Sequence, residues 1–214
     1  MQNLLLDPPT HYGQRDNIRR ILGIKDTAVL DMLLSSPRVA RHIDQSLTDR
    51  LGILPEMSEE EKRFVDTLLL PPPNQFRELA RVVAVLSQAK VVKRTFNGAT
   101  LAAVASFVGS REILSFIRDT EFPVFQGLLP SMELDEDILK NYAKTAEGFM
   151  FGLLPRNYQL RLLLQRPQGQ FCGGLAIAEP NAREALKALI TAAWRYLAEH
   201  KATSPDAESA DEDD

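Results

Sequence analysis

The chain has 214 residues, of which 44% are hydrophobic and 25% are charged, a balance typical of a globular protein with a real core. Its formal net charge is −4, but six of its 29 acidic residues lie among the last nine positions, which leaves 23 acidic residues against 25 basic ones. The body of the chain is therefore almost neutral, which argues against a broad electrostatic surface for nucleic acid.

Cys172 is the only cysteine, so the chain has no intramolecular disulfide framework and fits a reducing compartment. The first residues, MQNLLLDPP, lack the basic start and the long apolar run of a signal peptide. The longest nearly uncharged run, 95–110, is too short to span a bilayer. We therefore expect a cytoplasmic protein.

Helical spacing of apolar residues recurs from Asp16 to His200, whereas strand alternation is weak throughout. The sequence therefore predicts an all-α fold, an irregular multi-helix bundle. In the first third, Asp26 is expected to cap one helix, and Ser36 followed by Pro37 is expected to begin the next, which Gly52 ends. The run from Ser58 to Glu61 is a capping box, in which each side chain bonds the backbone of the other residue.

Pro71–Pro73 ends the following helix, because consecutive prolines remove backbone donors and fix φ. Asn74 is then expected to cap a long helix through about Arg94, which the Asn97–Gly98 turn ends. The apolar segment 99–109 follows, and we expect it to form a short helix that is buried on most sides. Its predicted core residues are Leu101, Val104 and Val108, and its alanines let neighbouring helices approach closely.

In the last third, Asp135 is expected to begin a helix that Pro155 interrupts, and 156–166 to form a short helix bounded by prolines. A glycine-rich loop precedes the last helix, which begins at Pro180. Residues 202–214 are acidic and lack large apolar side chains, so we expect a disordered tail. The remainder, 1–201, is expected to be a single helical domain, with 71–73 either a subdomain boundary or a rigid corner.

Motifs for chemistry are largely missing from the sequence. The histidines His11, His42 and His200 have no companion at a ligand spacing, and no phosphate-binding or nucleophile-elbow motif occurs. Cys172 lies between Phe171 and a glycine pair, where a structural thiol is the ordinary interpretation. We therefore expect no catalytic, metal-binding or cofactor-binding residues.

Two groups of basic residues are candidates for docking. Lys90, Lys93 and Arg94 share one side of the predicted long helix, and Arg156 and Arg161 recur in the helix bounded by prolines. One interpretation is a solvated helix face. The other is a docking surface for an acidic partner protein, in which charge sets association rate and partner choice.

Three stretches together resemble a known family: LLLDPPTHYGQRDNIRRIL, the central LARVVAVLSQAKVVKRTFNGATLAAVASFVGSREILSFI, and the late GFMFGLLPRNYQLRLLLQRP. The chain resembles the K-subunit family of bacterial type III secretion systems (YscK/SctK/OrgA/MxiK), which includes the rhizobial nodulation relative NolU. The matching features are an early Pro-x-x-Tyr segment at Pro9–Tyr12, the Asn97–Gly98 turn with the following Leu-rich helix, and a late Arg-Leu-x-Leu-x-x-Pro segment at Arg161–Pro167. The resemblance covers most of the chain from Leu4 to Pro167.

The resemblance implies a non-enzymatic adaptor in the cytosolic sorting platform at the base of the injectisome. Such an adaptor joins the cytoplasmic domain of the inner-membrane ring protein, the D subunit, to the pods built from the Q subunit, and it acts in effector export. The family context is virulence or symbiosis. The alternative is a helical enzyme or regulator that binds a small ligand.

Overall fold

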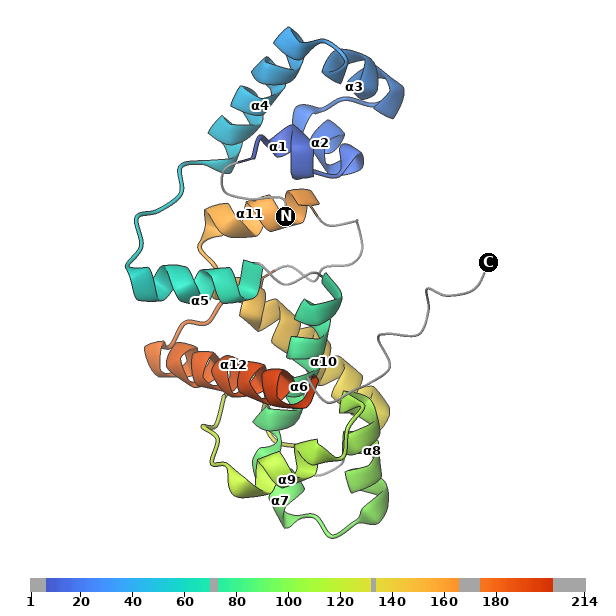
Figure 1. The fold of residues 1–214 in the computed structure, drawn as a ribbon, viewed down its shortest axis with the longest axis vertical. Helices are drawn as coiled ribbons and strands as arrows, with labels where there is room; N and C mark the ends of the chain where they lie inside the picture. Colours follow the sequence, from blue (N-terminus) through green and yellow to red (C-terminus); the bar gives the residue numbers. More distant parts are fainter. Residues whose placement is uncertain (1–6, 70–72, 132–133, 166–173, 202–214) are drawn as a thin grey trace. The chain divides into compact units, whose positions relative to one another are not determined.

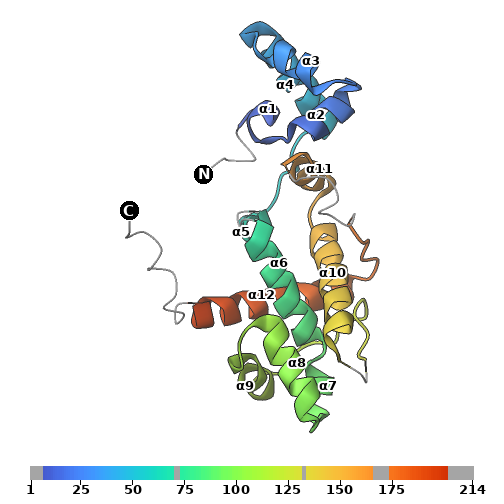
Figure 2. The ribbon, with the colours of Figure 1, turned by 90° about the vertical axis from the view of Figure 1, so that its right-hand side faces the viewer.

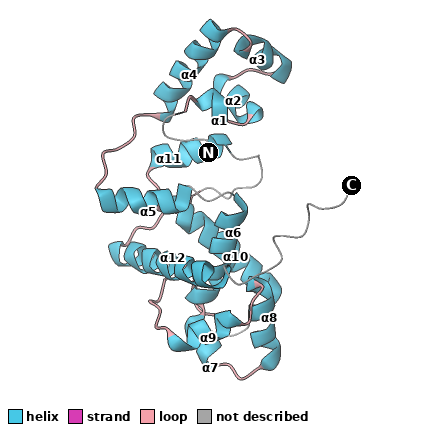
Figure 3. Cartoon of the chain, viewed as in Figure 1, coloured by secondary structure: helices cyan, strands magenta, loops and turns pink. Residues whose placement is uncertain are grey.

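The computed structural model describes residues 7–69, 73–131, 134–165 and 174–201, and its regular structure there consists of helices without strands (Figures 1 and 3). The predicted all-α fold is thus confirmed. The glycine-rich loop prediction falls mainly on 166–173, and the tail prediction on 202–214; both stretches lie outside the described residues. The helices are α1 Pro9–Tyr12, α2 Arg15–Leu22, α3 Thr27–Leu34, α4 Pro37–Leu51, α5 Glu59–Leu69, α6 Pro73–Ser87, α7 Ala89–Arg94, α8 Gly98–Val108, α9 Glu112–Asp119, α10 Glu136–Gly152, α11 Arg156–Gln165 and α12 Pro180–Lys201.

The chain divides into two compact units. Unit 1 comprises Met1–Leu70 and Phe151–Gly174, and unit 2 comprises Pro71–Met150 and Leu175–Asp214. One crossing between the units falls in the proline run where the sequence suggested a boundary. The crossing after Gly174 falls in the predicted glycine-rich loop, whereas the crossing after Met150 carries no sequence signal because Met150 lies inside α10.

Unit 1 is built around one apolar cluster that joins α1–α4 to α11. Its buried members are Tyr12, Ile18, Leu30, Ile43, Leu47, Leu51 and, from α11, Leu164. The backbone carbonyl of Leu164 accepts a hydrogen bond from the Gln14 amide at 2.8 Å, and Asn17 donates its side-chain amide to the Leu163 carbonyl at 2.8 Å. The C-terminal carbonyls of α11 thereby find partners at the start of α2, which fixes α11 against the N-terminal helices.

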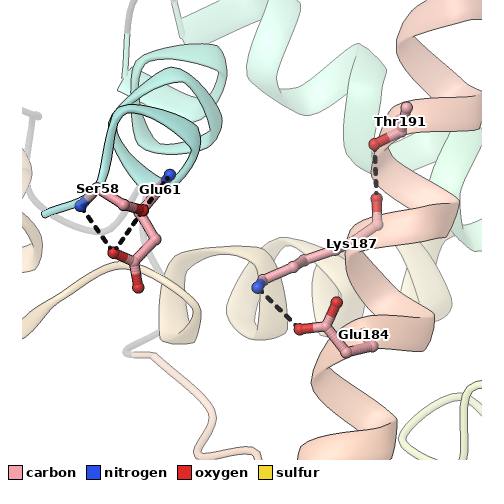
Figure 4. Close-up of polar contacts among 5 residues, drawn as sticks. All are labelled: Ser58, Glu61, Glu184, Lys187 and Thr191. Atoms are coloured by element: carbon pink, nitrogen blue, oxygen red, sulfur yellow. Dashed lines mark hydrogen bonds and ion pairs between the residues drawn. The ribbon is translucent and has the colours of Figure 1, made fainter.

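The helix ends of unit 1 follow the predicted caps closely. The Asp26 carboxylate accepts from the Ala28 amide at 2.8 Å, and Gly52 ends α4 with a positive φ of 76°. At the start of α5, Ser58 and Glu61 form the reciprocal capping box: the Ser58 amide donates to Glu61 Oε2 at 3.0 Å, and the Glu61 amide donates to Ser58 Oγ at 3.2 Å (Figure 4). Ser36 precedes Pro37 at the start of α4, but its side chain makes no capping bond.

Unit 2 is centred on α6, which packs extensively against α12 (Figures 1 and 2). Three aliphatic positions of α6, Leu79, Val82 and Val83, are fully buried. The apolar stripe of α12 is also buried and consists of Leu186, Leu189, Ile190, Ala193 and Leu197. Burial of these two apolar faces against each other stabilises the unit.

The single long helix predicted from Asn74 to Arg94 is wrong, because the chain breaks at Gln88 between α6 and α7. Gln88 is fully buried and leaves the helical region with φ −92° and ψ 8°. Its side-chain oxygen accepts from the Ser131 amide at 3.0 Å, and its amide lies within reach of the Leu128 and Leu129 carbonyls. The buried polar side chain thus satisfies a distant loop, an interaction that helical periodicity does not reveal.

The prediction that the segment 99–109 is buried on most sides is also wrong. In α8, Val104 is fully buried and Ala105 nearly so, but Leu101 and Val108 are only half-buried and Ala102 is exposed. The helix lies against α6 and α9 on one face only. Asn97 caps the start of α8 by accepting from the Ala99 amide at 2.9 Å, so the Asn97–Gly98 turn opens this helix and is not a C-cap of the preceding one.

In the ranges that the structure describes, no single helix combines the length and apolar character needed to cross a bilayer. The pair α8 and α9 reaches that composition only together, and the two helices are bent by 106° at their junction.

Candidate functional site

The basic residues predicted for docking on α7 take different positions. Lys90 and Arg94 lie one turn apart and are both exposed. Lys93 instead donates its ammonium group to the Thr120 carbonyl at 2.8 Å and lies 4.0 Å from the Glu121 carboxylate. Since Thr120 is the residue that ends α9, Lys93 satisfies a helix C-terminus and links α7 to α9.

Phe96 is the most conspicuous exposed residue near these cations. Its ring is 97% exposed, two residues after Arg94 and directly before the cap Asn97. A hydrophobic residue in that position commonly packs against the fourth helical residue, here Leu101, in a hydrophobic staple. At 97% exposure Phe96 makes no such contact, so its apolar ring is left to solvent. We call Lys90, Arg94 and Phe96 the α7–α8 corner.

The α7–α8 corner has the composition of a protein-docking surface. Aromatic and arginine side chains are enriched among the residues that dominate binding energy, and flanking charges mainly set association rate and partner choice. Sequence analysis identified the two cations but missed Phe96. A hydrophobic residue beside a predicted helix cap is ordinarily a staple, so its exposure could not be inferred from the sequence.

The two arginines of α11 also differ from each other. Arg156 is exposed in the first turn, whereas Arg161 is only 8% exposed. Arg161 donates to the Gly52 carbonyl at 3.2 Å and to the Asn157 carbonyl at 3.1 Å. The two arginines do not share a face of α11, since five helical residues separate them by about 140° around the axis. Arg161 instead ties the end of α4 to α11.

Arg161 also affects two buried tyrosines of unit 1. Burial raises the pKa of Tyr12; the Arg161 charge opposes that shift, and the Asp44 carboxylate adds to it. Burial likewise raises the pKa of Tyr158, again opposed by Arg161. Both phenols are therefore protonated at neutral pH and act as packing groups.

The predicted docking residues belong to two separate units: Lys90, Lys93 and Arg94 to unit 2, and Arg156 and Arg161 to unit 1. Among the described residues predicted for docking, Lys90 and Arg94 are the exposed cations that lie beside an exposed aromatic ring, Phe96.

Within the described ranges, no group of three or more His, Cys, Asp or Glu residues is arranged to hold a metal ion. Cys172 lies outside these ranges.

In comparisons with known proteins, no family model matches the chain, and neither a curated protein nor a solved structure matches it.

Proposed function

We propose that this protein is a non-enzymatic adaptor of the cytosolic sorting platform of a bacterial type III secretion injectisome. In this role it links the cytoplasmic domain of the inner-membrane ring protein to the pods of the Q subunit. The proposal rests on the resemblance of three sequence segments to the K-subunit family, and on the structural relationship of two of those segments within unit 1.

The observation that carries the proposal is the packing of the early segment against the late one. Asn17 of α2 and Leu163 of α11 are 146 residues apart in sequence, yet they share a hydrogen bond, and Tyr12 packs in one cluster with Leu164. A Cβ atom added to Gly13 would lie 2.9 Å from Leu164 Cγ and 2.8 Å from the Pro9 carbonyl oxygen, so the approach requires glycine. The early and late segments therefore form one interlocked core, as expected for a shared structural module.

The docking part of the proposal is assigned to the α7–α8 corner. An adaptor that joins and leaves a platform needs a surface that remains soluble when free, and isolated apolar side chains among charges satisfy that need. Phe96 supplies an aromatic anchor, and Lys90 with Arg94 supplies charge that favours an acidic partner face. The corner is expected to bind one of the two platform proteins directly.

The experiment is a pull-down of the D and Q subunits from native lysate with the full chain, with effector secretion as a second readout. The double variant Lys90→Glu with Arg94→Glu, and the single variant Phe96→Ala, are expected to reduce both signals while circular dichroism stays unchanged. The matched control is Arg118→Glu with Arg183→Glu, which makes the same charge change at two other exposed positions of unit 2.

Two outcomes would contradict separate parts of the proposal. If the wild-type chain recovers neither secretion protein, the adaptor role is wrong. If the wild-type chain recovers them and both corner variants do so equally well at low salt, the adaptor role stands and the docking surface lies elsewhere.

A further inference from the structure

A polar groove with a volume of about 330 Å³ lies within unit 2 and is lined by residues of α6, α8 and α10. It is separate from the α7–α8 corner, since none of the three corner residues lines it. The cations of its wall are Arg77 and Arg81 from α6 and Lys140 and Lys144 from α10, and Phe107 of α8 contributes an aromatic ring. We call it the α6–α8–α10 groove.

The charges of the groove favour an anionic ligand. Four basic side chains line it against two acidic ones, Glu136 and Glu147. Lys140 is already paired with Glu136 at 2.8 Å and with Asp137 at 3.6 Å, and these carboxylates raise its pKa. Arg81 lies over the Phe107 ring at 5.8 Å, which orients its guanidinium group without neutralising it.

Arg77 and Lys144 are the cations available to a ligand. Both are exposed, and neither forms an ion pair or hydrogen bond with another residue of the described ranges. Cations on two facing helices beside an apolar ring suit an extended peptide that carries several carboxylates, because its acids can reach both helices while its backbone crosses the ring.

The C-terminal part of the chain has this chemistry. Residues 202–214 carry the carboxylates Asp206, Glu208, Asp211, Glu212, Asp213 and Asp214 and no basic residue. They follow directly on α12, whose last turns lie at the junction of α8 and α9. The Tyr196 ring contacts Phe116 of α9 at a centroid distance of 5.3 Å, and the His200 ring stacks on Tyr196 at 4.5 Å.

The end of α12 therefore lies beside α9, which directly follows α8, the helix that supplies Ser106 and Phe107 to the groove. Ser110 lies just beyond the end of α8 and follows the lining residue Ser106 by four positions. The thirteen residues from Ala202 to Asp214 have a fully extended length of roughly 43 Å, so their length allows the acidic half to reach the groove.

We propose that the α6–α8–α10 groove binds the chain's own acidic C-terminal segment, residues 202–214, through Arg77 and Lys144. The tethered segment occupies the groove at an effective concentration in the millimolar range, so it excludes free acidic peptides unless they bind more tightly. The groove is thereby a self-masked site for acidic peptide, and salt weakens the masking because the groove is open to solvent. This inference is independent of the secretion proposal.

The test compares full-length chains with a fluorescent peptide of residues 202–214 as the probe, at low salt. In the neutral-tail chain, the six carboxylates of 202–214 are changed to the corresponding amides. We expect this chain to bind the probe, and the native chain to bind it about tenfold more weakly because its own segment competes. Adding Arg77→Glu and Lys144→Glu to the neutral-tail chain should abolish binding.

The control adds Arg118→Glu and Arg183→Glu to the neutral-tail chain, which changes the net charge equally outside the groove and should leave binding nearly intact. Three results would overturn the proposal: no binding of the probe by the neutral-tail chain, equal binding by the native and neutral-tail chains, or equal loss in the control and groove variants. The second result would mean that the groove takes an acidic segment of another protein and leaves its own unbound.

Amide chemical shifts provide a second test that does not depend on the groove variants, so a folding defect in those variants would not affect it. Between the native chain and the neutral-tail chain at low salt, the amides of Ala80, Phe107 and Ala143, which line the groove, are expected to shift. The shifts should shrink as salt is raised. Unchanged shifts at these positions would contradict occupancy of the groove by the C-terminal segment.

Discussion

At the scale of single residues, buried polar groups determine where the chain is held together. Arg161 is a charged side chain in the interior of unit 1, and its guanidinium group bonds two main-chain carbonyls from different helix ends. Gln88 plays a comparable part in unit 2 through its bond to the Ser131 amide. Burying each of these polar side chains costs free energy, and the hydrogen bonds that the side chain forms offset this cost.

Replacing Arg161 with methionine is expected to lower the free energy of unfolding by about 2 kcal/mol, because two hydrogen bonds from a charged donor are lost and the Gly52 and Asn157 carbonyls lose a partner. Arg156→Met, on the exposed face of the same helix, should change it by less than about 0.5 kcal/mol. Urea unfolding measures both. Equal effects of the two substitutions would contradict the structural role of Arg161.

Tyr196 makes the opposite case. It is 2% exposed, and its hydroxyl makes no hydrogen bond of normal geometry within the described ranges, although the Ser110 side chain lies close enough to oppose the rise in its pKa. Tyr196→Phe removes an unsatisfied buried group, so the melting temperature is expected to stay the same or to rise. A fall of several degrees would show that the hydroxyl does have a partner in the folded chain.

The same substitution has a pH signature. Burial raises the pKa of Tyr196 above 10.0, so the folded state holds the phenol proton more tightly than the unfolded state does. That contribution is complete below pH 10 and is lost as the pH rises through the higher folded value. Tyr196→Phe should therefore lose less stability than the wild-type chain above pH 10, as measured by denaturant unfolding at several alkaline pH values.

At the scale of the helices, side-chain caps separate strong helix starts from weak ones. Ser58→Ala removes the reciprocal bonds with Glu61 and is expected to cost about 1 kcal/mol. Ser36→Ala is the matched comparison, because Ser36 begins α4 without a side-chain capping bond and should cost less. Thermal unfolding followed by circular dichroism compares the two. A larger loss for Ser36 would reverse this assignment of the caps.

The one-sided burial of α8 can be tested on two of its residues. Val104→Asp places a carboxylate in a fully buried position and is expected to cost several kcal/mol. Ala102→Asp makes the same charge change on the exposed face of the same helix and should be nearly neutral. Denaturant unfolding distinguishes these outcomes. Equal destabilisation by both substitutions would restore the expectation that α8 is buried on most sides.

At the scale of the whole molecule, unit 1 is assembled from two separate stretches of chain. A fragment of residues 1–70 lacks α11 and exposes the cluster that Leu164 covers, so it is expected to show little cooperative unfolding. Addition of a peptide of residues 151–174 should restore helical signal and cooperativity. The same peptide with Leu164→Asp is the control and should fail. Cooperative folding of the fragment alone would show that α11 is dispensable.

The sequence by itself determined the fold class and most helix ends of this protein, because amphipathic spacing and caps such as Asp26, Ser58 and Pro180 are local signals between neighbouring residues. Tertiary structure alone decided the break at Gln88, the burial of Arg161 and the exposure of Phe96. The break at Gln88 depends on the loop around Ser131, and the burial of Arg161 depends on the end of α4, both far away in the chain. Phe96 is exposed because no described segment covers it. Local periodicity carries no information about such long-range contacts, and it is these contacts that separate the cations available for docking from those that hold the fold together.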